Sequence, residues 1–132
     1  MNPSRALPRL VLAAVLLAAP PVLAEEGKDK PKTTFVEVRP LTATLMRQGG
    51  RRGVLTVELG LDVQDPALRK RAEQSTPILR DAYVRVVQAY AFGLSPGATP
   101  SADFLAITLQ RETDKVLKRP GARVLLGAVL AN

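Results

Sequence analysis

One run of the chain alternates strictly between apolar and polar side chains, and it limits the fold more than any other feature. From Val54 to Val63 every second side chain is apolar; these positions are Leu55, Val57, Leu59, Leu61 and Val63. The positions between them hold threonine, glutamate, glycine and aspartate. Because successive side chains of a β-strand point to opposite faces, the pattern predicts a strand with one face on the core and the other in solvent.

A second strand is expected immediately before this one. Residues Thr34 to Met46 are rich in apolar and β-branched side chains, and Pro40 is expected to break or bend the strand. Gly49, Gly50 and Gly53 then supply a flexible turn. The two strands are therefore predicted to form a hairpin.

Helix signals follow the hairpin directly. Asp65 before Pro66 is typical of an N-cap followed by proline at the first helical position, and Thr76 before Pro77 repeats that arrangement. The sequence leaves open whether one helix continues through Pro77 with a kink or two helices meet there. Apolar residues spaced by three and four positions then mark one buried helix face, which ends at Gly93.

The last part of the chain predicts another helix and a final strand. Ser101 can cap this helix, Pro120 ends it, and Arg123 to Ala131 indicates a strand that is apolar on both faces. The order strand, strand, helix, helix, strand implies an α+β fold with a small sheet and helices packed on one face. We expect a single domain over residues 34–132, after a charged, disordered lead-in at residues 25–33.

The first 24 residues have the pattern of a secretory signal peptide. Two arginines precede an apolar stretch from Leu10 to Ala19, and Val22 to Ala24 places small or short side chains at a signal-peptidase site. The stretch is shorter than the roughly 20 apolar residues of a membrane helix. We therefore expect export by the general secretory route to the periplasm, with cleavage after Ala24 and a mature chain beginning at Glu25. Retention of the segment would instead anchor the protein in the inner membrane, facing the periplasm.

The composition excludes several kinds of catalytic chemistry. The sequence contains no histidine and no cysteine, so histidine-based acid–base catalysis, thiol nucleophiles and the usual zinc and haem ligands are excluded. Glu58 and Asp62 share a strand face roughly 13 Å apart, farther than the roughly 5–9.5 Å between paired glycosidase carboxylates. Asp62 and Asp65 do not follow the pattern of a calcium loop and are expected to be a strand-end residue and a helix cap. We therefore expect no enzyme activity, catalytic residue, metal or cofactor.

Arginines gather at the predicted hairpin turn. Arg47, Arg51 and Arg52 surround its glycines and can form an exposed site for anionic groups or an acidic protein, or simply a solvated turn. Two of the 19 basic residues precede Ala24 and all 12 acidic residues follow it, so the expected mature chain has a net charge of 17 − 12 = +5. Nucleic acid is not an expected partner, because the aromatic residues are scattered and four of the five lie on predicted helices as expected core residues.

Three parts of the chain carry a family resemblance: the run Arg52–Val63, the proline-begun segment Thr76–Tyr83, and the late helix leading to a final apolar strand. Together they resemble the periplasmic domain of the flagellar basal-body-associated FliL family, over roughly residues 34–131. Pro77, Arg80 and Asp81 match the Pro-x-Ile-Arg-Asp type segment of that family. Members ordinarily carry an N-terminal transmembrane helix, where this chain has the segment expected to be cleaved. Arg80 and Asp81 can equally be two independent surface contacts, because adjacent helix residues do not face each other.

The resemblance implies a stomatin-like α+β fold that assists the flagellar stator at the inner-membrane face of the periplasm, without catalysis. Its implied partner is a protein of the stator or basal body, and whether the domain forms oligomers stays open. A second hypothesis is a free periplasmic factor that binds envelope components or anionic polymers through Arg47, Arg51 and Arg52. Contact with the membrane is expected only if the N-terminal segment is not cleaved.

Overall fold

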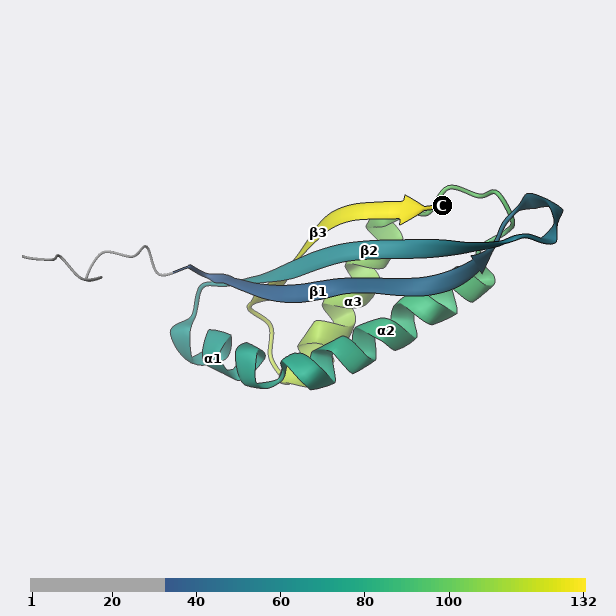
Figure 1. Ribbon diagram of the computed structural model, residues 1–132. Helices are drawn as coiled ribbons and strands as arrows, with labels where there is room; N and C mark the ends of the chain where they lie inside the picture. Colours follow the sequence, from purple (N-terminus) through teal and green to yellow (C-terminus); the bar gives the residue numbers. More distant parts are fainter. Residues whose placement is uncertain (1–32) are drawn as a thin grey trace, which may run out of the picture. The chain divides into compact units, whose positions relative to one another are not determined.

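The computed structural model describes residues 33–132. The signal segment, and the lead-in up to residue 32, lie outside the described residues. A three-stranded antiparallel sheet in the order β1-β2-β3 is covered on one face by helices, so the α+β fold predicted from the sequence is confirmed (Figure 1). The elements are β1 (Phe35–Met46), β2 (Arg52–Val63), α1 (Pro66–Gln74), α2 (Thr76–Gly93), α3 (Ala102–Leu117) and β3 (Ala122–Ala131).

The helical segment after β2 is divided into two helices. α1 ends at Gln74 and α2 begins at Thr76, and Ser75 between them is the C-cap of α1 and the N-cap of α2. Pro77 lies in the first turn of α2, where its missing N–H leaves no helical hydrogen bond unmade. The described residues therefore contain three α-helices where the predicted order named two, and the structure has two helices rather than one kinked helix around Pro77.

Both edge strands carry an extra residue at the level of Glu58 in the central strand. The pairing of β1 with β2 shifts register between Val38 and Leu41. The pairing of β3 with β2 shifts between Leu126 and Val129, which face the two neighbours of Glu58. β2 itself is regular throughout. After the extra residue, the alternation of inward and outward side chains resumes one position later in the sequence. The apolar side chains on both sides of each bulge therefore face the helices.

The core lies between the inner sheet face and the helices. The five alternating apolar side chains predicted for β2 are all buried, as expected from the sequence. One polar pair lies among the apolar side chains: Tyr83 Oη is 2.6 Å from Thr113 Oγ1, and both residues are fully buried. Thr113 Oγ1 donates to the carbonyl oxygen of Leu109 at 2.8 Å, so the Tyr83 hydroxyl is the donor to Thr113. α2 and α3 are thus joined by a short chain of hydrogen bonds inside the core.

Candidate functional site

The three arginines singled out from the sequence lie together at the tip of the β1–β2 hairpin. The turn is closed by a hydrogen bond from Arg47 N to Arg51 O at 2.7 Å, and Gly49 and Gly50 adopt positive φ angles that favour glycine. Arg47, Arg51 and Arg52 are all exposed. Within residues 33–132 their guanidinium groups form no ion pair and no hydrogen bond. The tip therefore presents three unpaired positive charges to solvent.

Pro77, Arg80 and Asp81, the residues matched to the family motif, do not converge on one site. Arg80 Nη1 donates to the carbonyl oxygen of Arg39 at 2.7 Å and lies 3.4 Å from that of Pro40, both in the β1 bulge. Asp81 instead forms an exposed ion pair with Arg85 at 3.1 Å, one turn along α2. Adjacent residues on this helix therefore make separate contacts, and Arg80 holds the start of α2 against the edge of β1.

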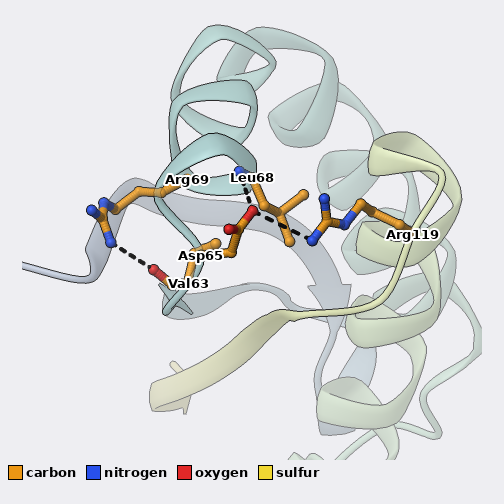
Figure 2. Close-up of polar contacts among 5 residues, drawn as sticks. All are labelled: Val63, Asp65, Leu68, Arg69 and Arg119. Carbon is orange, nitrogen blue, oxygen red and sulfur yellow. Dashed lines mark hydrogen bonds and ion pairs between the residues drawn. The ribbon is translucent and has the colours of Figure 1, made fainter.

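Asp62 and Asp65 belong to the junction between β2 and α1, and Figure 2 shows the contacts of Asp65 there. Asp65 Oδ2 accepts a hydrogen bond from Leu68 N at 2.9 Å, as an N-cap does, and lies 3.4 Å from Nη2 of Arg119 in the turn after α3. Asp62 accepts from Gln64 Nε2 at 3.0 Å. The two carboxylates have separate partners, in agreement with their expected roles as strand-end residue and helix cap. No group of three metal-ligating side chains occurs in the described part of the chain.

A groove between α2 and α3, lined mainly by apolar side chains, is a surface that the sequence did not predict. The ring centroids of Tyr90 and Phe104 are 5.5 Å apart, and Tyr90 Oη accepts a hydrogen bond from Ser101 N at 2.6 Å. These contacts join the end of α2 to the start of α3. The groove has a volume of about 630 Å³, and its lining includes Val86, Ala89, Tyr90, Gly93, Phe104 and Thr108.

The expectation that the helical aromatic residues are core residues is wrong for two of the four. Phe104 is 54% exposed at the groove, and Phe92, which is not among the residues that line the groove, is 95% exposed; only Tyr83 is fully buried. Helical phase could have revealed this for Phe92. It lies two positions after Tyr90, a rotation of about 200° at 3.6 residues per turn, and so falls away from the buried stripe of α2.

Comparison with known proteins gives no family assignment. No protein-family model and no curated protein matches the chain. Between residues 33 and 132, no helix has both the length and the apolar character needed to cross a membrane. The surfaces themselves therefore carry the functional argument.

Proposed function

We propose that this chain is a periplasmic protein-interaction domain without catalytic activity, which assists the flagellar motor by contacting a stator or basal-body protein. The observation that carries the proposal is the apolar, aromatic-lined groove between α2 and α3. The resemblance of the β2 run and of the start of α2 to the FliL family supports the flagellar setting.

The groove has the character of a binding surface. Aromatic side chains are enriched at protein interfaces, where they bury a large area at low cost in conformational entropy. Tyr90 and Phe104 are held in place by their stacking and by the hydrogen bond to Ser101, so little side-chain freedom remains to be lost on binding. Phe104, which lines the groove, is 54% exposed and offers apolar area that a partner could cover. A contact of this kind is expected to survive moderate salt, because its centre is apolar.

The test is complementation of a deletion strain in swimming and surface-motility assays. We expect the deletion to impair motility and the wild-type gene to restore it. Phe104→Ser should fail to restore motility although the protein stays folded, since Phe104 is more than half exposed and its stacking on Tyr90 contributes only about 0.5–1.5 kcal/mol. Val54→Ser is the matched control: Val54 is also an exposed apolar residue, 46% exposed, but lies on the sheet face opposite the helices. It should restore motility fully.

Two results would contradict the proposal. Normal motility of the deletion strain in both liquid and surface assays would remove the flagellar role. Equal restoration by Phe104→Ser and Val54→Ser, with both proteins exported and folded, would show that the α2–α3 groove is not the working surface.

The hairpin tip supports a second candidate function, binding of anionic envelope polymers. Three exposed arginines without ion-pair partners among the described residues are free to meet phosphate or carboxylate groups. Such binding should fall steeply between low and physiological salt, because exposed charges are screened beyond about 8 Å at 0.15 M. The triple change Arg47→Ala, Arg51→Ala and Arg52→Ala should abolish it, yet should restore motility if the groove is the contact. A folded triple variant that fails to restore motility would favour the tip.

A further inference from the structure

The outer edge of β3 is far less protected than the opposite edge of the sheet. Within residues 33–132 β3 pairs with β2 alone, so alternate N–H and C=O groups along its other side point away from the sheet. Proteins usually protect such edges with bulges, prolines or charged side chains, because an open edge can pair with another chain. The β1 edge has all three, in the bulge at Pro40 and the contacts of Arg80. β3 also has a bulge, but its run Val124–Asn132 has no proline and no charged residue.

A single side chain from α3 pairs with the start of this edge. Gln110 Nε2 donates to the carbonyl oxygen of Ala122 at 2.8 Å, and Gln110 Oε1 accepts from Val124 N at 2.8 Å. A carboxamide has the same donor and acceptor as a peptide group, so Gln110 pairs with β3 as one peptide unit of a neighbouring strand would. No other hydrogen bond to this edge is formed within residues 33–132. Beyond Val124 the outer backbone groups of the strand have no hydrogen-bond partner in this part of the chain, although the loop at residues 94–100 lines a pocket with the end of β3.

The register identifies which groups of this open stretch point outward. Asn132 and Val54 exchange both backbone hydrogen bonds, at 2.9 and 3.0 Å, so the backbone N–H and C=O groups of Asn132 point toward β2. In an antiparallel pair the direction alternates along the strand, and Val129 and Ala131 therefore direct their N–H and C=O groups outward. Leu126 does the same on the other side of the bulge, because it lies two residues after the outward-pointing Val124.

The side chains of β3 also lack cover. Its inner-face residues after Ala122 are only partly buried, whereas the inner-face residues of β1 are all buried. On the outer face, Leu125 is 39% and Leu130 is 50% exposed. A further strand beside β3 would satisfy the outward backbone groups and cover apolar area on both faces at once.

The charges around β3 favour one class of occupant over a second copy of the chain. The uncharged run Val124–Asn132 follows Lys118 and Arg123 and ends beside the hairpin tip. The β1–β2 hairpin extends past the end of β3 (Figure 1), and the arginines at its tip are exposed. Antiparallel pairing of two copies of β3 would bring the basic start of one strand toward the basic tip of the other. Like charges facing each other disfavour that pairing, whereas acidic groups would be attracted at both ends.

We propose that the outer edge of β3 binds an extended peptide with an apolar centre and acidic flanks, which adds to the sheet as a fourth strand. Recognition rests on the outward backbone groups of Leu126, Val129 and Ala131, with the basic residues at each end selecting the flanks. This surface is separate from the α2–α3 groove and does not depend on a flagellar role.

The test uses the protein purified from the periplasm and a capped synthetic peptide of alternating valine and threonine with glutamates at both ends. Two control peptides have lysine flanks or N-methyl groups along the whole centre. Peptide binding should slow amide hydrogen exchange at Leu126, Val129 and Ala131. Affinity should fall at least tenfold with lysine flanks and be lost on N-methylation. Ala131→Pro removes one outward N–H with a small change in side chain, and should weaken binding about threefold to tenfold.

Three results would overturn the proposal. Equal binding of the N-methylated peptide would show that backbone pairing is not involved. Slowed exchange confined to the α2–α3 groove would place the peptide elsewhere. Protection of the β3 amides that grows with protein concentration in the absence of peptide would identify a second copy as the occupant. Because the peptide controls act on wild-type protein, they decide the matter even if Ala131→Pro does not fold.

Discussion

The buried pair Tyr83–Thr113 allows a sharp test of the packing between α2 and α3. The hydrogen bonds run in one direction, from the Tyr83 hydroxyl to Thr113 Oγ1 and from Thr113 to the carbonyl oxygen of Leu109. The two single substitutions therefore differ in what they leave behind. Tyr83→Phe removes the first donor but leaves Thr113 bonded to Leu109. Thr113→Val leaves the Tyr83 hydroxyl buried without an acceptor.

This difference sets the expected magnitudes. Tyr83→Phe should lower the free energy of unfolding by about 0.5–1.5 kcal/mol, the net value of one hydrogen bond. Thr113→Val should cost about 1–3 kcal/mol, because a buried polar group left unpaired carries its full desolvation penalty. In the double variant neither hydroxyl remains. Its cost should fall below the sum of the single costs by about 1 kcal/mol or more, since the orphaned hydroxyl has been removed.

Urea unfolding of the four proteins, followed by circular dichroism, measures these free energies. Thermal melts give a second readout, with about 4–8 °C per kcal/mol expected for a domain of this size. The reasoning is refuted if Thr113→Val costs no more than Tyr83→Phe. It is also refuted if the sum of the two single costs equals the cost of the double variant to within about 0.3 kcal/mol. Independent sites are additive in this way, whereas a hydrogen-bonded pair is not.

Two further predictions concern the same core. Burial raises the pKa of Tyr83 from 10.0 to about 12; the hydrogen bond between Tyr83 and Thr113 opposes the rise and the charge of Asp114 adds to it. The folded state thus holds this proton more tightly, so the contribution of Tyr83 to the free energy of unfolding should be constant well below pH 10 and fall by about 2–3 kcal/mol as the pH rises to 12. Tyr83→Phe should lack this fall in pH-dependent urea unfolding. Leu59→Ala should cost about 2–5 kcal/mol in thermal melts and Glu58→Ala less than about 1 kcal/mol, since Leu59 is buried and Glu58 exposed; equal costs would mean that the faces of β2 are misassigned.

The sequence predicted β2 well because this strand is regular. Its alternation runs without interruption, and the structure buries each apolar position that the pattern selected. The edge strands were harder to interpret because each changes its phase at a bulge. Arg123–Ala131 was predicted to be apolar on both faces, and β3 has apolar side chains on both, but the extra residue that shifts its inward positions is visible only once the register with β2 is known.

The candidate surfaces also differ in whether the sequence could predict them. The clustering of Arg47, Arg51 and Arg52 followed from their position around one tight turn, which local sequence determines. The groove could not be predicted from local sequence, because it depends on how α2 and α3 lie against each other and on the loop that connects Gly93 to Ser101. The contact of Gln110 with β3 is likewise a tertiary feature: nothing in the pattern of α3 distinguishes this glutamine from a solvated one.

The paired bulges beside Glu58 also determine where the chain can change in length. Each edge strand carries one residue more than the central strand requires at this level, so a single deletion there would restore regular pairing without turning apolar side chains outward. The same deletion within β2 would reverse half of a strand that lies between two others. Over evolutionary time, we expect insertions and deletions to accumulate near Pro40 and Gly127, while the spacing of the residues in Val54–Val63 stays fixed.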